Sequence, residues 1–235
     1  MIIGISGYVG NRLTGIGRVL INILSELAKQ YPEDKYVLFR NFDFKEYDNL
    51  TQYQNIEIVD VPYTKESGLK NILWHQWLFQ KLLKKYKCDI AYIPNFTLLL
   101  WKTIPTIVTI HDLIEYNVPD KFSKARMFYR KQVCDPLMAK KSNHILTVSK
   151  SSYKDIISYL GVKPSKLTLT LNATDRNVFK KYSKEKIIPA IKKYNLEYKK
   201  YLLFVGTIDF PGKNIKTIIE AFFNLRSKNE LNGIK

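Results

Sequence analysis

Thr106-Ile-Val-Thr-Ile-His-Asp-Leu113 lies near the middle of this 235-residue chain and identifies its fold class. Residues 107–110 are β-branched at every position, which is typical of a central strand covered on both faces. His111 and Asp112 follow at once, where the carboxyl end of such a strand meets ligands in open parallel sheets. We therefore predict a parallel sheet with His111 and Asp112 at its ligand-binding edge.

The segments on both sides of this strand alternate between short strands and amphipathic helices. The predicted strands are residues 2–5, 36–40, 56–61, 89–93, 107–110, 144–148 and 167–171. Apolar residues recur at helical spacing over 16–28, 69–83 and 123–141, and in a further helix that we expect Ser152 to cap and Gly161 to end. Such alternation implies βαβ units and an α/β fold with a mainly parallel sheet.

Composition excludes several classes of protein. With 46% hydrophobic and 25% charged residues, the chain is neither collagen-like, disordered nor a disulfide scaffold. Lysine and arginine number 38 against 21 aspartates and glutamates, a formal net charge of +17. This excess favours nucleic acid, an anionic membrane or a phosphorylated substrate without choosing among them, and a genome-wide lysine bias would also produce it.

Cysteine usage and the N-terminus indicate the compartment. Cys88 and Cys134 are the only cysteines and lie far apart, so the sequence suggests a reducing compartment with neither zinc site nor disulfide framework. Residues 1–6 are expected to form a strand and not a signal peptide. Apolar stretches fall far short of the roughly 20 residues that cross a bilayer, which predicts a soluble or peripheral protein.

Glycines at positions 7, 10, 15 and 17 follow the first predicted strand and lead into the helix over 16–28. Glycines allow close backbone approach, and helix starts attract anions, which predicts contact with a phosphate. A purely structural turn is an equal alternative, because the third glycine of a dinucleotide fingerprint and a Walker lysine are missing. Arg18, beside the loop, favours the phosphate interpretation.

Histidine at a strand end can exchange a hydrogen bond with a sugar hydroxyl, which is the role we predict for His111. The alternative is a core histidine satisfied by backbone groups. His75 on a helix and His144 at a strand start are weaker candidates. The sequence contains no Ser/His/Asp order, metal-ligand cluster or close carboxylate pair, so hydrolase and metalloenzyme functions have no support.

A second domain begins after a lysine-rich linker over residues 176–199, which contains one predicted helix near 187–194. Residues 201–205 are expected to form a strand, and apolar residues over 215–223 predict another helix. One strand and one helix cannot bury a core of their own, so this domain is expected to be incomplete. Lys213 and Asn214 precede the last helix, where they could hold a diphosphate, although exposed lysines are common in this chain.

Seven of these segments, in order, resemble the family-four glycosyltransferases, retaining enzymes of the GT-B fold. The matching stretches are residues 14–18 (TGIGR), 88–95 (CDIAYIPN), 106–113 (TIVTIHDL), 145–150 (ILTVSK), 160–162 (LGV), 172–175 (NATD) and 203–207 (LFVGT) through 212–214 (GKN). The resemblance implies a Rossmann-like acceptor-binding domain over 1–180 and a linker over 181–199. It also implies the beginning of a nucleotide-sugar-binding Rossmann-like domain over 200–235.

The resemblance also implies roles for individual residues. Gly15 and Gly17, with Arg18, face the donor diphosphate or the transferred sugar, and the catalytic His111, with Asp112, approaches sugar hydroxyls. Lys213, beside Asn214, neutralises the leaving diphosphate, so that no bound metal or other cofactor is expected.

The sequence departs from the family pattern in three places. Gly212 stands where the family often has arginine, and Ala173 replaces the usual glycine of an Asn-Gly-x-Asp turn. The family's acidic pair would lie beyond Lys235, since neither Glu220 nor Glu230 corresponds to it. We therefore expect little transferase activity from these 235 residues alone.

The predicted activity is transfer of a hexose from a nucleotide sugar to a glycan or lipid-linked acceptor in polysaccharide or lipopolysaccharide biosynthesis. GDP-mannose, UDP-hexose and dTDP-rhamnose remain open as donors. The resemblance implies a cytoplasmic protein, with peripheral attachment to the anionic inner face of the membrane left open. The alternative is a basic α/β module that binds nucleic acid or membrane without catalysis, although we expect no nucleic-acid partner.

Overall fold

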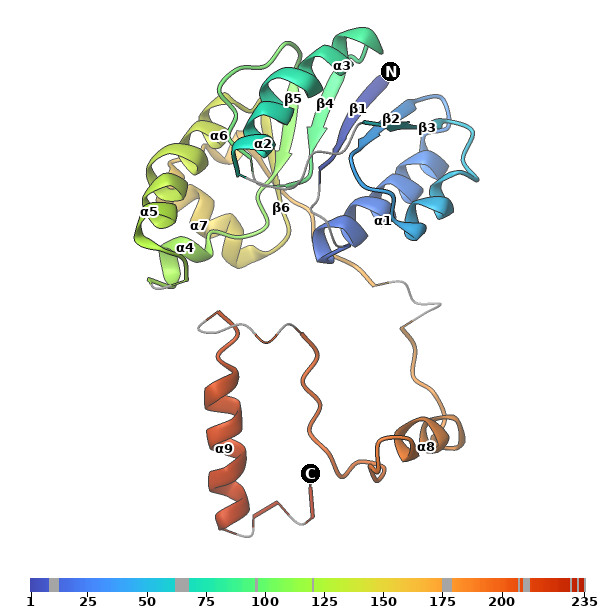
Figure 1. Cartoon of the computed structure of the whole chain (residues 1–235), viewed down its shortest axis with the longest axis vertical. Coiled ribbons are helices and arrows are strands. Elements are labelled where there is room, and N and C mark those ends of the chain that lie inside the picture. The colour runs from blue at the N-terminus through green and yellow to red at the C-terminus, as the bar shows by residue number, and fades with distance from the viewer. Residues whose placement is uncertain are drawn as a thin grey trace. The chain divides into compact units, whose positions relative to one another are not determined.

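The computed structural model describes residues 1–8, 13–61, 68–95, 97–119, 121–174, 179–206, 208, 212–228, 230–231 and 233–234. The chain divides into two compact units (Figure 1). The first contains residues 1–117 and 123–172, and the second contains residues 118–122 and 173–235.

The first unit is built on a parallel sheet, as predicted. Its strands are β1 (Ile2–Gly7), β2 (Lys35–Arg40), β3 (Ile56–Asp60), β4 (Ile90–Ile93), β5 (Thr106–Thr109), β6 (His144–Thr147) and β7 (Leu167–Leu169). They lie in the order β3-β2-β1-β4-β5-β6-β7, and all neighbouring pairs are parallel. The chain changes direction across the sheet between β1 and β4, which is the switch point where open parallel sheets bind ligands.

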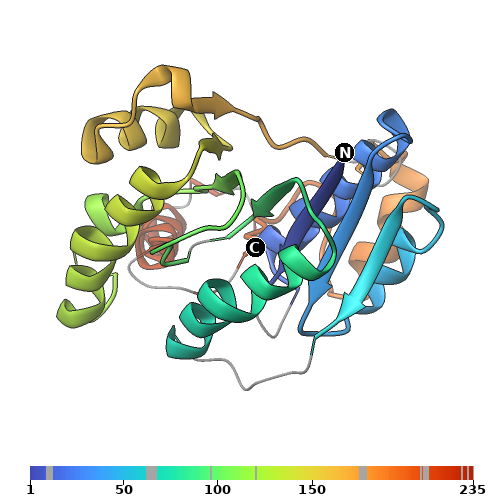
Figure 2. The same ribbon diagram turned by 90° about the horizontal axis from the view of Figure 1, so that it is seen from above.

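Helices pack on both faces of the sheet (Figure 2), but beside α1 an apolar pocket of about 370 Å³ lies over Ile3, Ile90, Ile107 and Leu146. On one face, α1 (Gly15–Gln30) and the 3₁₀ turn η1 (Lys45–Leu50) pack on side chains such as Ile5 and Leu38. On the other face, Val37, Phe39 and Val108 pack with the remaining helices. Those helices include α7 (Lys150–Leu160), and short turns occur at α4 (Ile114–Asn117) and η4 (Pro164–Lys166).

Two of the predicted helices contain a π-helical segment. Their parts are α2 (Gly68–Leu73), η2 (Trp74–Leu78) and α3 (Phe79–Lys85), then α5 (Lys124–Phe128), η3 (Tyr129–Cys134) and α6 (Asp135–Lys141). In η2, the wider turn buries three consecutive side chains, Trp74, His75 and Gln76. The apolar pattern predicted the helices but not the wider turns within them.

The predicted cap of α7 was wrong. Ser149 is the N-cap, and its Oγ accepts the backbone N–H of Ser152 at 3.0 Å. Ser149 has the extended backbone that a cap requires, whereas Ser152 lies inside the first turn and donates its hydroxyl to the His111 carbonyl at 2.8 Å. Gly161 ends the helix with a left-handed φ of 62°, as predicted.

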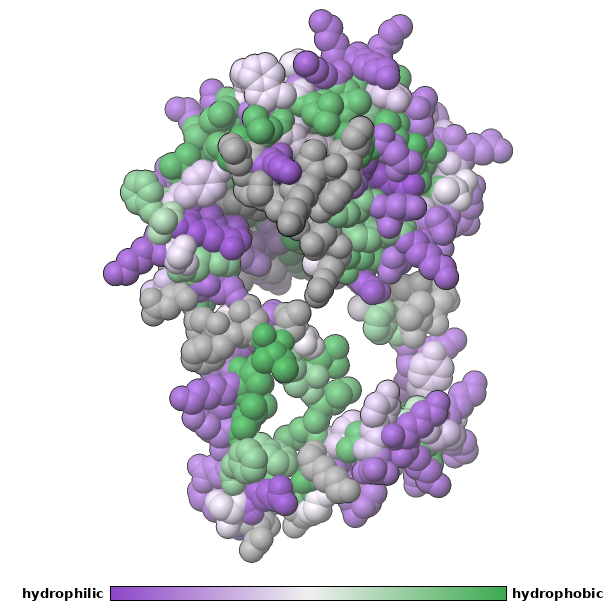
Figure 3. Space-filling view, in the orientation of Figure 1, coloured by the Kyte–Doolittle hydropathy of each residue, from purple (hydrophilic) through white to green (hydrophobic). Residues whose placement is uncertain are grey.

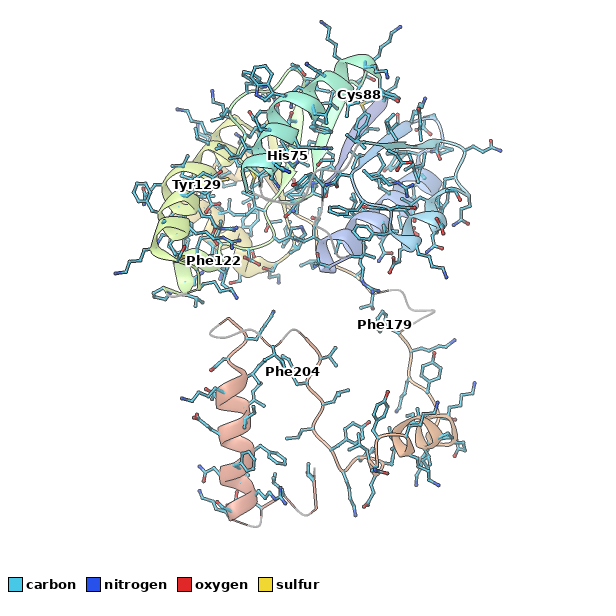
Figure 4. All side chains as sticks on the ribbon, viewed as in Figure 1. His75, Cys88, Phe122, Tyr129, Phe179 and Phe204 are labelled. Carbon is cyan, nitrogen blue, oxygen red and sulfur yellow. The ribbon has the colours of Figure 1, made fainter. Side chains whose placement is uncertain are left out.

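The buried thiols are consistent with the predicted absence of a disulfide. Cys88 (Figure 4) and Cys134 are both free. Burial raises the pKa of Cys88 to about 11 and that of Cys134 to about 12. Both side chains therefore remain as thiols at neutral pH and act as small core residues.

The second unit contains α8 (Lys184–Lys192) and α9 (Ile215–Ser227), close to the predicted helices. The strand predicted over residues 201–205 was wrong: in the part of this unit that the structure describes, no strand is formed. A strand requires a neighbour to accept its backbone hydrogen bonds, and this segment has none there. Leu203 and Val205 are consequently exposed, by 72% and 83%.

Candidate active site

A pocket of about 150 Å³ lies at the carboxyl edge of the sheet in the first unit. Its lining residues are Ile16, Asn95, Thr109, Ile110, His111, Asp112, Arg130 and Met138. Ile16 belongs to the first turn of α1, between the predicted Gly15 and Gly17. The structure therefore brings the glycine-containing helix start and the His111–Asp112 pair to one pocket.

His111 is half-buried and is held from two sides. Its ring Nε2 lies 2.9 Å from the Pro94 carbonyl oxygen in the loop after β4. Because a carbonyl only accepts, Nε2 carries a proton, and Nδ1 remains for a further hydrogen bond. The His111 carbonyl accepts the Ser152 hydroxyl from α7 at 2.8 Å. The hydrogen bond to Pro94 thus fixes the ring at the pocket, and its sugar-binding role stays a prediction.

The start of α1 offers backbone donors without a side-chain cap. Thr14 is the N-cap and makes no side-chain capping hydrogen bond, and no acidic residue lies in the first turn. A Cβ at Gly15 would meet nothing within 4 Å, and Gly15 does not have a positive φ. Neither backbone strain nor crowding therefore requires glycine there, whereas close approach of a ligand would. Gly17 is buried and Arg18 is exposed.

Asp112 has a structural partner at the pocket rim. Its Oδ1 accepts the backbone N–H of Ile114 at 3.3 Å, which closes a turn at the start of α4. The side chain is exposed and lines the pocket. Its binding role stays a prediction.

The other two histidines have structural roles. His75 (Figure 4) is fully buried: Nδ1 donates to the Asn71 carbonyl, and Nε2 accepts from the Ser6 hydroxyl, each at 2.9 Å. Burial lowers the pKa of His75 to about 4, so the ring is neutral. His144 pairs with the Thr168 hydroxyl at 2.8 Å, away from the pocket.

A buried acidic cluster lies behind the pocket, and the sequence analysis missed it. Arg130, from η3, donates through Nε to Glu115 Oε1 at 2.8 Å, and the Glu115 side chain is fully buried. Asp135, at the start of α6, is also fully buried. Glu115 Oε2 and both Asp135 oxygens have no conventional donor among the described residues. Two carboxylates cannot donate to each other, so a proton held on Asp135 and donated to Glu115 accounts for one oxygen of each residue and leaves the second Asp135 oxygen without a described donor.

The charge of this cluster is close to neutral. Burial, together with the adjacent Glu115 carboxylate, raises the pKa of Asp135 to about 8, against the opposing effect of Arg130. Asp135 therefore keeps its proton at neutral pH, while Glu115 and Arg130 form an ion pair. No sequence pattern identifies these residues. They come together because the helix after α4 is turned so that Arg130 and Asp135 lie against Glu115.

Asp135 is expected to make the stability of the first unit fall as pH rises. Between about pH 4 and pH 8 the folded protein keeps a proton that the unfolded chain has lost, so each pH unit costs up to about 1.4 kcal/mol. In Asp135→Asn this loss disappears, and the variant gains stability relative to the wild type from pH 5 to pH 8. Urea unfolding at several pH values tests this, with the exposed Asp48→Asn as control; parallel profiles of Asp135→Asn and the wild type would contradict it.

The remaining predicted residues lie in the second unit. Asn214 is the N-cap of α9 with a left-handed φ of 47°, and its Oδ1 accepts the Thr217 hydroxyl at 2.8 Å. Lys213 precedes it and is exposed. Gly10, Asp175 and Thr207 lie outside the described residues. Within the described ranges, no three His, Cys, Asp or Glu side chains gather as metal ligands, and no helix is long and apolar enough to span a bilayer.

The first unit has the fold of the doubly wound α/β proteins, with its pocket at the edge where they bind ligands. Residues 13–178 match the family model of Glycosyltransferase Family 4, and the chain belongs to this family. The family predicted from the sequence is thereby confirmed.

Comparison with known proteins supports this assignment. The chain is 27% identical over 223 residues to O-antigen chain mannosyltransferase B of Escherichia coli, covering 89% of this chain and 56% of that protein. The chain thus spans little more than half the length of this relative.

Two solved structures confirm the predicted GT-B fold. WaaG, a glycosyltransferase involved in lipopolysaccharide biosynthesis, has a TM-score of 0.64 at 15% identity, covering 94% of this chain and 58% of that one. A glycosyltransferase from Rickettsia africae ESF-5 has a TM-score of 0.58 at 12% identity, covering 96% and 57%. At such low identities the likeness concerns the fold alone.

Proposed function

We propose that the protein transfers a hexose from a nucleotide sugar to a glycan or lipid-linked acceptor during synthesis of a surface polysaccharide. The observation that carries this proposal is the family match over residues 13–178, which includes both the start of α1 and His111. The relative in Escherichia coli is named for O-antigen mannosyl transfer, so mannose is the first sugar to test. The protein acts on the cytoplasmic side of the membrane, where nucleotide sugars are made.

Residues at the pocket of the first unit, and Lys213 in the second unit, are assigned specific roles in this reaction. The backbone N–H groups of the first turn of α1, which Thr14 does not cap, bind an anionic group of the donor or the transferred sugar. His111 Nδ1 accepts a hydroxyl of the sugar, with the ring already oriented by Pro94. Lys213 supplies positive charge to the leaving diphosphate, so the reaction requires no bound metal ion. The anomeric configuration is retained, as in the family that the sequence resembles.

A competing function, a basic module that binds nucleic acid without chemistry, rests on the net charge of +17 alone. Family membership favours the transferase. A gel shift at increasing salt separates the two, because tight and sequence-tolerant DNA binding that is lost at moderate salt would favour the module.

The proposal is tested with the complete gene product and with GDP-mannose, UDP-hexoses and dTDP-rhamnose offered singly to lipid-linked glycans in isolated membranes. We expect one donor to add one hexose, seen by mass spectrometry, with the configuration retained by NMR. His111→Ala is expected to lower kcat/KM by about 10- to 100-fold, because a buried hydrogen bond to the sugar is lost.

His144→Ala is the matched control, since this histidine lies away from the pocket and should leave transfer unchanged. Absence of transfer from every donor would overturn the proposed function. Equal activity of His111→Ala and the wild type would overturn only the role of His111.

A further inference from the structure

The outer surface of residues 68–85 carries exposed apolar side chains that lie outside the His111 pocket. Leu73 and Trp77 lie one turn apart on this helix, Leu100 and Trp101 lie on the loop after β4, and each is 45–54% exposed. The two tryptophan rings contact each other edge to face, with centroids 4.9 Å apart. These four residues form the Trp77–Trp101 patch. A contiguous exposed apolar patch of this kind indicates an interaction surface.

Buried glutamines hold the patch in place. The Gln76 side-chain oxygen accepts the backbone N–H groups of Leu100 and Trp101 at 2.9 and 3.1 Å. The Trp101 indole N–H donates to the Gln76 carbonyl at 2.7 Å, and Gln80 accepts both the N–H and the hydroxyl of Thr103. The polar edge of Trp101 is therefore satisfied inside the protein while its ring stays partly in solvent. The loop is fastened in the conformation that presents the tryptophan outward.

The π-helical segment contributes to the same arrangement. Because η2 turns Trp74, His75 and Gln76 into the core, the next residue, Trp77, faces outward. The helix thus separates a buried aromatic residue from an exposed one three residues later.

The two segments that carry the patch are basic. Residues 68–88 contain five lysines and no aspartate or glutamate, and residues 97–111 contain Lys102 and no acidic residue. Lys81 and Lys84 follow Trp77 at helical spacings of four and seven, so they lie on the same side of the helix. Figure 3 shows hydrophobic side chains beside hydrophilic ones on the surface over α3. The surface therefore suits a partner that is apolar within and anionic at its boundary.

We propose that the Trp77–Trp101 patch is the face that docks on an anionic phospholipid bilayer. Tryptophan favours the boundary between lipid headgroups and acyl chains, and Leu73 and Leu100 would enter the apolar layer beside it. Lysines whose stems run along an apolar surface place their ammonium groups among anionic headgroups. This inference deepens the proposed function, because a lipid-linked acceptor lies in a membrane, and it assigns the docking to particular residues.

A sugar-stacking platform is the main competitor for an exposed tryptophan pair. Such a platform needs hydrogen-bonding groups at the rim of the rings, since sugars carry hydroxyls around their apolar faces. Here the rings adjoin two leucines, and the indole N–H of Trp101 is already used internally. The chemistry of the patch favours lipid.

Vesicle sedimentation tests the proposal without donor or acceptor. Wild-type protein is expected to bind vesicles of phosphatidylcholine with about one-third phosphatidylglycerol, and to bind phosphatidylcholine alone much more weakly. Leu73→Ser with Trp77→Ser is expected to reduce binding by at least about tenfold, because withdrawal of large apolar side chains from water is lost. Tyr194→Ser, at a tyrosine that is 76% exposed in the second unit, is the control and should bind as the wild type does.

Brominated lipids give a second readout that charge alone cannot produce. Trp77 and Trp101 should be quenched on binding, while the double variant should show little quenching. Binding without quenching, or equal binding by the double variant with native circular dichroism, would overturn the proposal. Protection of the tryptophans by a soluble oligosaccharide but not by lipid would do the same and would identify the sugar platform. Failure of transfer activity would leave these results unaffected.

Discussion

Replacing Arg130 with methionine is expected to lower the free energy of unfolding of the first unit by about 3–5 kcal/mol. Arg130 is the cation that faces the fully buried Glu115 carboxylate, at 2.8 Å. Without it, the buried Glu115 carboxylate loses its ion-pair partner. All three tryptophans lie in this unit, at positions 74, 77 and 101, so urea unfolding followed by their fluorescence reports on it.

A double variant separates the ion pair from simple loss of side-chain volume. Glu115→Gln with Arg130→Met removes both charges and should recover most of the lost stability, because removing both partners costs far less than leaving one alone. A loss below about 1 kcal/mol in Arg130→Met would show that the pair contributes little in this interior.

The acidic cluster shows where prediction from sequence stops. Glu115 and Arg130 are fifteen residues apart, and their contact depends on how α4 turns back on the next helix. The π-helical segment η3 shifts the phase of that helix at Arg130, so a regular helical period would misplace the side chain. No local pattern encodes this contact, because both residues are charged and occur in an otherwise amphipathic helix.

His111, in contrast, could be predicted from the sequence, because a local pattern marks its position. The β-branched run before it predicts a central strand, and the end of such a strand lies at the ligand edge by topology alone. The register of β4 beside β5 then fixes the Pro94 carbonyl near the ring, which the sequence does not state. Local periodicity thus located the residue, whereas tertiary pairing determined its orientation and protonated nitrogen.

The segment over residues 201–205 shows a different limit. Its apolar composition predicts a strand, but a strand forms only where a neighbouring strand shares its backbone hydrogen bonds. Ile218, Ile219 and Phe223 on α9 are likewise 47–59% exposed. A helix and an extended segment with this much exposed apolar surface lack the neighbours that would bury it.

Lys213→Ala is expected to lower kcat by about 100- to 1,000-fold in the complete gene product. Under the proposed function, negative charge develops on the diphosphate as the sugar leaves, and a fixed ammonium stabilises that state more than the bound donor. KM should therefore change little, because the interaction strengthens only in the transition state.

Lys216→Ala provides a matched control, because it also removes a lysine near the start of α9. Lys216 is three residues further along, is exposed and pairs with Glu220 at 3.6 Å, so its loss removes one positive charge without removing the group at the helix start. Steady-state kinetics should show full activity in Lys216→Ala and partial recovery in Lys213→Arg, which keeps the charge in a different geometry. Equal losses in the two alanine variants would mean that overall charge matters and not Lys213, and a rise in KM alone would place Lys213 in ground-state binding.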